Sequence, residues 1–424
     1  MLETIMERRN LEKALLQVER NKGVGGVDGM QTDALRDYLS TNYLQLRQEV
    51  ISGNYTPSPV RKVEIPKPQG GVRMLGIPTV IDRVLQQAIG QWLGQFYEPN
   101  FSKFSYGFRP KRNAHQAVIQ AQTFLNEGKT RVIELDLEKF FDKVNHDTLM
   151  SLLMRKINDK ATLRFIRQYL RSGIMEGGVV SQRKEGTPQG SPLSPLLSNI
   201  ILDELDKELT RRRHSFVRYA DDCSIYVRSK KSANRVLKSI TKYIEESLKL
   251  KVNKEKSKVS HPVESTLLGF SFYNYKGKWT IRIAKKSIKR IKEKSKSITE
   301  RNNGMNTTQK IAKMRPIIKG WVNYFSIAKA KAIMQELDEC VRSRLRMGLW
   351  KEWKNCKTRV KQLQYLKASK QKSYEWGNSS KGYCRVAHSP ILCRTLNNAH
   401  FSKLGYVSFY RTYIDLTETQ TSLF

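Results

Sequence analysis

The chain has 424 residues, of which 39% are hydrophobic, and its 77 Lys and Arg against 39 Asp and Glu give a net charge of +38. This composition excludes a disordered chain, and the length suits about two to four domains. Five cysteines without a C-x-x-C pair exclude a disulfide framework and a zinc ribbon. So large a positive excess predicts a polyanionic partner, and the many aromatic residues, which can stack on bases, favour nucleic acid.

The N-terminal segment and the hydropathy pattern bear on location. The first ten residues, MLETIMERRN, are charged, which argues against a secretory signal. No run reaches the roughly 18 apolar residues of a membrane span. We therefore expect a soluble protein of a reducing compartment, without membrane association.

Helices and one hairpin are expected in the N-terminal part. Residues 1–50 show helical spacing, interrupted by a loop at Asn21–Met30 whose four glycines suit a mobile lid. Two strands between residues 55 and 78 are joined by a Pro-Gly turn at Pro68–Gly71. The apolar residues of Val80–Tyr97 recur every four positions, which predicts a helix.

The middle of the chain mixes strands with helices. Val132–Leu137 alternates with the period of a strand, and Asp136 lies on one of its faces. Ser194–Leu209 has leucines and isoleucine at helical spacing. Phe216–Val227 has two β-rich arms around Asp221-Asp222, which predicts a hairpin. This mixture, up to about residue 280, indicates an α+β domain.

The composition changes after about residue 280. Residues 281–370 hold 25 Lys and Arg against six Asp and Glu, which is half of the whole net charge. Their pattern is helical, with an apolar stripe that leaves Arg342, Arg344 and Arg346 off it. A basic face is often merely solvated, but an excess of one sign favours contact with nucleic acid. The remaining residues, 371–424, give no clear pattern.

Asp221 and Asp222 are adjacent carboxylates at the predicted hairpin tip, where they repel each other. Asp is common in turns, so such a pair alone has a structural explanation. Here Asp136 ends a second apolar strand, and three carboxylates brought together can bind two Mg²⁺ ions for phosphoryl transfer. The sequence therefore offers a candidate active site.

Seven segments follow one another in the order found in a known family. They are IPKPQGGVRMLGIP at Ile65–Pro78, SYGFRPKRNAHQA at Ser105–Ala117, LDLEKFFDKVNH at Leu135–His146, EGTPQGSPLSPLLSNI at Glu185–Ile200, YADD at Tyr219–Asp222, LLGFSF at Leu267–Phe272 and GWVNYF at Gly320–Phe325. Together they resemble the group II intron-encoded reverse transcriptase/maturase, in its compact bacterial form without an endonuclease domain.

The resemblance implies a right-hand polymerase of α+β class. Fingers and palm, built from an antiparallel sheet plus helices, would precede a basic helical thumb with a C-terminal extension. We expect four parts: an N-terminal extension with a template-covering loop (1–55), the fingers and palm core (56–280), the helical thumb or maturase domain (281–370) and a nucleic-acid-binding extension (371–424).

The implied activity is that of an RNA-directed DNA polymerase, a nucleotidyltransferase. It would copy an RNA template from a DNA or RNA primer with dNTPs. Group II intron RNA and target DNA are further expected partners, because such proteins assist splicing and retrohoming. The resemblance also implies a cytoplasmic, nucleoid-associated protein of a bacterium. Two alternatives stay open: a maturase whose polymerase is vestigial, and a reverse transcriptase of another bacterial system, such as a retron or a CRISPR-linked protein. The tail after Gly377 lacks paired Cys and His spacing, so no endonuclease activity is expected.

The resemblance also assigns roles to individual residues. Asp136, Asp221 and Asp222 would bind two Mg²⁺ ions, for which Mn²⁺ can substitute, and Leu137 would add its backbone carbonyl. These ligands would support attack of a primer 3′-hydroxyl on a nucleotide α-phosphate. The remaining assignments are Lys67 and Arg73 on the triphosphate, Phe141 against a 2′-hydroxyl, Gln189 in the nucleotide pocket, and Gly269 and Phe270 at the primer grip.

Three positions leave alternatives. Phe140 adjoins Phe141, and one of the two is expected in the core. A lysine near the leaving pyrophosphate matches either Lys256 or Lys258. Ser191 stands where a glycine is usual in this family, and it adds a hydroxyl near the templating base pair.

Overall fold

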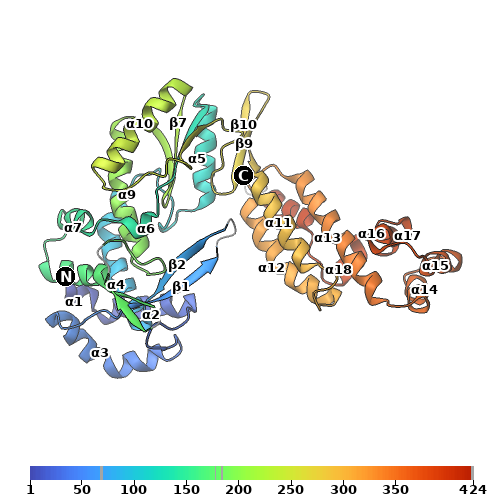
Figure 1. Cartoon of the computed structure of the whole chain (residues 1–424), viewed down its shortest axis with the longest axis horizontal. Helices are drawn as coiled ribbons and strands as arrows, with labels where there is room; N and C mark the ends of the chain where they lie inside the picture. The colour runs from blue at the N-terminus through green and yellow to red at the C-terminus, as the bar shows by residue number, and fades with distance from the viewer. Residues whose placement is uncertain (67–69, 177, 183–184, 422–424) are drawn as a thin grey trace. The chain divides into compact units, whose positions relative to one another are not determined.

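The structure is a computed structural model that describes residues 1–66, 70–176, 178–182 and 185–421. The chain divides into two units, Met1–His261 and Pro262–Phe424, and each is described by itself (Figure 1). Both mix helices with antiparallel strands, so the α+β class is confirmed. The expected boundary after residue 280 falls inside the second unit, and the division into four parts stays a prediction.

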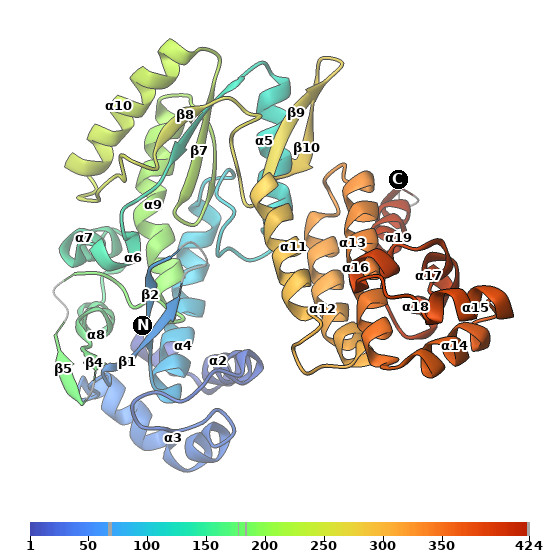
Figure 2. The same ribbon diagram turned by 45° about the vertical axis from the view of Figure 1, so that its right-hand side comes forward.

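The central sheet of the first unit has the strand order β6-β7-β3-β8, and all its neighbours are antiparallel. Helices α5 and α10 lie on either side of it (Figure 2). Val132 and Ile133 point to opposite faces of β3, and both are 0% exposed. The bounds are β3 Arg131–Leu135, β6 Ser215–Tyr219, β7 Asp222–Val227, β8 Lys258–Ser260, α5 Ala114–Asn126 and α10 Lys230–Glu246.

A second sheet, which we call the hairpin sheet, has the order β2-β1-β4-β5. Strands β1 and β2 pair antiparallel, whereas β4 joins β1 in parallel. The expected hairpin is therefore confirmed. Part of its turn, including Lys67, lies outside the described residues. The bounds are β1 Val60–Pro66, β2 Val72–Ile77, β4 Ile174–Glu176 and β5 Val179–Ser181.

The remaining helices of the first unit form its core together with the sheets. Helix α4 spans Val80–Tyr97 as expected, and the Thr79 side chain caps it by accepting a hydrogen bond from the Asp82 backbone. Helix α9 begins at Ser194 and continues two residues beyond the expected end, to Arg211. The others are α1 Leu2–Ile5, α2 Arg8–Asn21, α3 Leu35–Ser52, the 3₁₀ helix Glu98–Asn100, α6 Phe140–Lys143, α7 His146–Met154 and α8 Lys160–Arg171.

A buried carboxylate joins three parts of this unit. Asp82, 1% exposed, accepts hydrogen bonds from the hydroxyls of Tyr55 at 2.8 Å and Tyr169 at 3.1 Å. It also accepts from Thr79 Oγ1 at 2.8 Å and the Ser58 backbone at 3.1 Å. Because every partner is a neutral donor, burial still raises the pKa of Asp82. The network fixes α8 and the segment before β1 against α4.

The glycine loop Asn21–Met30 is packed against the protein at Gly25 and Gly26 and exposed at Val24 and Gly29, and its template-covering role stays a prediction. A Cβ at Gly26 would lie 2.6 Å from the Thr79 backbone, so only glycine allows this approach. The buried Arg83 donates to the carbonyls of Pro78 and Val24 and so ties the loop to the start of α4. Close approach therefore explains Gly26, whereas Gly29 has open space around it and a left-handed φ of +72°.

The second unit begins with a two-stranded antiparallel sheet and continues with helices. Helices α11, α12 and α13 pack side by side (Figure 2). The bounds are β9 Phe270–Tyr275, β10 Lys278–Ile283, α11 Lys285–Ile298, α12 Thr307–Phe325, α13 Lys331–Glu352, α14 Cys356–Tyr365, α15 Lys370–Gly377, α16 Tyr383–Ala387, α17 Pro390–Thr395, α18 Asn398–Lys403 and α19 Phe409–Thr421.

Some basic residues of this unit are structural, including two of the three arginines that the sequence placed off the apolar stripe. Arg346 is 8% exposed and donates to the Ala387 carbonyl at 2.7 Å, so it holds α16 against α13. Arg344 donates to Thr299 Oγ1 at 2.7 Å. Within the described residues, no helix is long and apolar enough to cross a bilayer.

Candidate active site

A two-residue turn between β6 and β7 carries Asp221. Tyr219 pairs with Asp222 across the hairpin, and Ala220 takes a left-handed φ of +56°. A two-residue hairpin loop of this kind favours a positive φ at its first position, usually with glycine there. The turn therefore presents two consecutive carboxylates at the end of the sheet.

Asp136 follows β3 at the same end of the sheet. Because Leu135 pairs with Cys223, the next residue along β3 lies beside Asp222. Lost hydration and the charges of the two other carboxylates raise the pKa of Asp222 to about 6, although its side chain stays partly exposed. Burial, followed by the charge of Asp136, also raises the pKa of Asp221. The three carboxylates are therefore near enough to repel one another.

The loop before β8 fixes the backbone of Asp136. The Asp136 carbonyl accepts a hydrogen bond from the Asn253 backbone at 2.8 Å, and its amide donates to Ser257 Oγ at 3.0 Å. Lys256 Nζ lies 3.7 Å from Asp136 Oδ2, whereas Lys258 lies on β8 opposite Glu134. Of the two candidate lysines, the structure places Lys256 at the carboxylates.

A fully buried ion pair lies beneath the turn. The guanidinium of Arg218, on β6, donates to both carboxylate oxygens of Asp206, on α9, at 2.8 and 2.6 Å. The same group donates to Asn199 Oδ1 and to the Ala220 carbonyl, each at 2.9 Å. Both charged side chains are 0% exposed. This pair fixes the turn from within, and sequence reasoning missed it.

Gly107, in the SYGFRP segment, closes the other side of the turn. A Cβ at this position would lie 2.2 Å from the backbone nitrogen of Ala220, so no other residue fits. The Gly107 carbonyl accepts from Asn199 Nδ2 at 2.9 Å. The SYGFRP motif marked Gly107 as a residue of interest, but only the fold shows that it lies against Ala220.

Backbone hydrogen bonds join the segments that carry the three described residues expected to bind a nucleotide, Arg73, Phe141 and Gln189. The Gly76 amide, on the strand of Arg73, donates to the Gln189 carbonyl at 2.8 Å. The Thr187 amide donates to the Phe141 carbonyl at 2.6 Å. Arg73 also lowers the pKa of Asp221, against the larger effect of burial, so its charge acts at the carboxylates. The structure thus brings these three residues together.

The two aromatic residues after Asp136 differ in burial. Phe140 is 3% exposed and belongs to the core, whereas Phe141 is only partly buried, so Phe141 is the one available to a ligand. Ser191, whose role was open, is 6% exposed and its hydroxyl donates to Gln86 Oε1 on α4. The extra hydroxyl therefore anchors the loop that carries Gln189.

The expected primer-grip residues belong to the second unit. Phe270 is 0% exposed, and its ring lies 4.9 Å from that of Phe325 in the GWVNYF segment. Gly269 has a φ of +81°, and a Cβ there would lie 2.9 Å from Ser287 Oγ. The Phe270 side chain is therefore structural, and only backbone near Gly269 is left to meet a primer.

Comparison with known proteins identifies the family. The family of reverse transcriptases (RNA-dependent DNA polymerases) matches residues 65–272, and the group II intron maturase-specific domain matches residues 288–366. Protein YkfC of Escherichia coli is 34% identical over 274 residues, which cover 56% of this chain and 72% of that protein. The chain belongs to the group II intron-encoded reverse transcriptase/maturase family. The expected family and enzyme class are thereby confirmed.

Two further relatives agree with this assignment. The group II intron-encoded protein LtrA of Lactococcus lactis is 36% identical over 47% of this chain, but the match spans only 33% of LtrA. Maturase-like protein 1 of Euglena gracilis is 25% identical over 77% of this chain and 69% of its own length. A solved Cas6-RT-Cas1–Cas2 complex matches at 22% identity over 58% of this chain and 42% of that chain, with a TM-score of 0.35, which supports no conclusion.

A reverse transcriptase domain implies a divalent metal, and the residues of this reverse transcriptase fit one. All three donors are carboxylates, the hard oxygen ligands that Mg²⁺ prefers. Without a cation they repel, as the raised pKa of Asp222 shows. Among the described residues, no group of three or more His, Cys, Asp and Glu is arranged as a finished metal site.

We predict that Asp222→Asn stabilises the metal-free reverse transcriptase at pH 8. The folded carboxyl has a pKa of about 6 against an ordinary value of 3.8, so its charge disfavours the fold increasingly as pH rises through that window. The variant's Tm in EDTA should exceed that of the parent at pH 8, by a margin that shrinks as the pH falls from about 6 towards 3.8. Asp142→Asn, at an exposed position, is the control. A lower Tm for Asp222→Asn at pH 8 would refute the repulsion.

A second prediction concerns the buried ion pair. Arg218→Met should lower the free energy of unfolding by about 3–5 kcal/mol, because it leaves the Asp206 charge buried and unpaired. Arg218→Met with Asp206→Leu should recover part of that loss but stay deficient in DNA synthesis, since the Ala220 carbonyl still lacks its donor. Arg213→Met, at an exposed position, is the control. A double variant that copies at the parental rate would show that the pair does not position the carboxylates.

Proposed function

We propose that Asp136, Asp221 and Asp222 hold two Mg²⁺ ions and that this site extends a primer on an RNA template with dNTPs. Bound ions of this kind stabilise the attacking and leaving oxygens in phosphoryl transfer, and Mn²⁺ can substitute. The Leu137 carbonyl would complete the ligand set. The observation that carries the proposal is the convergence of three carboxylates, from two paired strands, at one end of the central sheet.

The chain's own residues would orient the reacting groups. Arg73 would bind the triphosphate, because its charge already acts at Asp221. Lys256, 3.7 Å from Asp136, would neutralise charge near the leaving pyrophosphate. Gln189 would line the nucleotide pocket, and Lys67 keeps its expected role as a second phosphate ligand. Backbone near Gly269 and Phe270 would contact the primer.

The second unit supports the RNA-binding part of the proposal. Residues 281–370 carry 25 Lys and Arg against six Asp and Glu, and the maturase-specific domain matches 288–366. A surface with this excess attracts the phosphate backbone of RNA. Binding of group II intron RNA would assist splicing, and binding of target DNA, with a nucleoid location, would follow in retrohoming.

Primer extension by the purified full chain tests the catalytic proposal. With an RNA template, dNTPs and Mg²⁺, we expect extension that falls at least about a thousandfold in Asp221→Asn/Asp222→Asn, because several kcal/mol of charge stabilisation are lost. Glu245→Gln/Glu246→Gln, an adjacent acidic pair on α10, should leave the rate unchanged. If the parent binds RNA but extends no primer, the chain is a maturase with a vestigial polymerase. A double Asp variant that still copies would mean that the site is elsewhere.

Phe141 should exclude a ribonucleotide by contact with its 2′-hydroxyl. The side chain is partly buried and stands beside the loop of Gln189, so its removal opens space there. Phe141→Ala should raise incorporation of ribonucleotides, relative to dNTPs, by roughly 10- to 100-fold. Phe140→Leu, in the core, should lower Tm without changing this ratio. An unchanged ratio in Phe141→Ala would contradict the assignment.

A further inference from the structure

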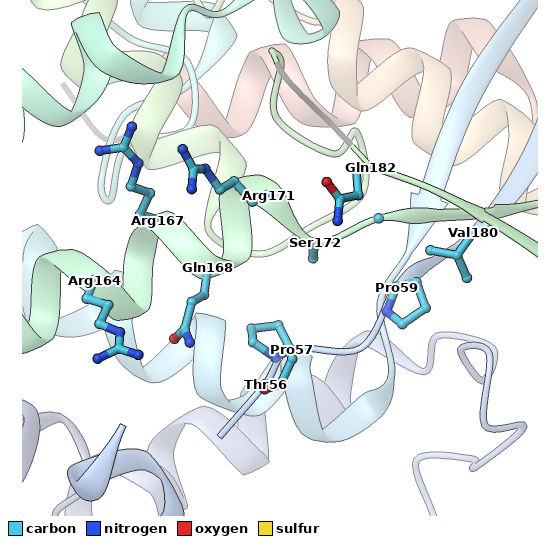
Figure 3. Close-up of a pocket in the computed structure, with 11 residues that line it drawn as sticks. Thr56, Pro57, Pro59, Arg164, Arg167, Gln168, Arg171, Ser172, Val180 and Gln182 are labelled. Atoms are coloured by element: carbon cyan, nitrogen blue, oxygen red, sulfur yellow. The ribbon is translucent and has the colours of Figure 1, made fainter. Parts of the chain in front are cut away.

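A pocket of about 500 Å³ opens in the first unit, at the hairpin sheet, and the carboxylates lie at a different sheet (Figure 3). Helix α8 supplies Arg164, Arg167 and Arg171. The segment before β1 supplies Pro57 and Pro59, and the β4–β5 arm supplies further wall residues. No role assigned above uses this pocket.

The walls of the pocket are held in place. Asp82 joins the two of them, because it accepts from Tyr55 and Ser58 on one side and from Tyr169 of α8 on the other. The Gly173 carbonyl accepts from the Val60 amide at 2.8 Å and so connects the β4–β5 arm to β1. The pocket is therefore a preformed feature of the fold.

Its positive charge is largely uncompensated. The three arginines follow one another on successive turns of one helix face, and Arg164 and Arg171 are exposed, without an ion-pair or hydrogen-bond partner among the described residues. Arg167 pairs with Asp147 at 2.7 Å, yet its buried Nε has no acceptor in the described part of the chain. The guanidinium groups of Arg164 and Arg171 are therefore the ones that remain available to a ligand.

We propose that this pocket binds backbone phosphates of single-stranded RNA, as a second RNA site separate from the carboxylates. Guanidinium groups suit phosphate because their forked donors match its oxygens. Pro57 and Pro59 give an apolar wall against which a ribose or base can lie. RNA is favoured over an acidic peptide because the proposed function, on which this inference rests, already brings an RNA strand to the first unit.

The salt dependence of RNA binding tests the proposal. The probe is a short fluorescein-labelled oligouridylate, titrated with the full chain at several salt concentrations. Arg164→Gln/Arg171→Gln should lower the slope of log K against log salt by about 1.4, that is, about 0.7 for each lost phosphate contact on a single strand. Extrapolated from 1 M salt, this corresponds to about tenfold weaker binding at 0.15 M.

The matched control is Lys231→Gln/Lys238→Gln, which removes two exposed charges from α10 of the same unit. It should leave the slope near that of the parent. Equal slopes for the pocket variant and this control would overturn the proposal, since the arginines would then act only as general surface charge. Because Arg164 and Arg171 are exposed, the pocket variant should keep the parental Tm.

Single uncharged methylphosphonate linkages in the probe locate the contact. At one or two positions, an uncharged linkage should weaken binding of the probe to the parent. At the same positions it should not further weaken binding to Arg164→Gln/Arg171→Gln, because the linkage and the arginines are then partners in one interaction. Equal loss in both proteins at every linkage would overturn the proposal. So would an oligoglutamate that displaces the probe from the parent and not from the pocket variant, because the pocket would then take an acidic peptide.

RNA binding at the pocket and primer extension at the carboxylates can be tested independently. Asp221→Asn/Asp222→Asn should bind the oligouridylate with the parental salt slope while it fails to extend a primer. The pocket variant should extend a primer at saturating template. A parent that extends nothing but shows the arginine-dependent slope would refute the catalytic proposal alone.

Discussion

Repulsion among three carboxylates at one end of the central sheet is the constraint on which the rest of the site depends. Asp136 and Asp222 come from two paired strands, and burial together with the charges of Asp221 and Asp136 raises the pKa of Asp222 to about 6. Such a cluster disfavours the metal-free fold, so rigid groups must hold it until a cation arrives. The buried Arg218–Asp206 pair and Gly107 supply that rigidity from below.

The loops around the carboxylates are also held in place by hydrogen bonds between distant segments. Backbone hydrogen bonds join the strand of Arg73 to Gln189 and the Gln189 loop to Phe141, so segments far apart in the sequence depend on one another for their positions. Ser191 adds a further anchor to α4. A cation at the carboxylates, a triphosphate at Arg73 and RNA at the basic residues of 281–370, as proposed above, would together fit one reaction on a nucleic-acid template.

Local sequence patterns predicted strands and helices such as α4, but they did not predict contacts between residues far apart in the sequence. Helix α4 has the expected ends because its apolar period and its Thr79 cap are visible in the sequence. An arginine within an apolar strand, such as Arg218, indicates a buried acidic partner. That the partner is Asp206 follows only from the packing of α9 against β6. Arg346 was read as a surface charge, because its buried acceptor on Ala387 comes from a segment without a readable pattern.

The most direct test of the account is metal-directed cleavage of the chain. Fe²⁺ replaces Mg²⁺ in the purified protein, and ascorbate with peroxide generates hydroxyl radicals at the bound ion. The account predicts backbone cuts beside both Asp136 and Asp221–Asp222, which excess Mg²⁺ suppresses and Asp222→Asn weakens. Cuts at only one of these segments, or elsewhere in the chain, would contradict a metal site shared by the three carboxylates.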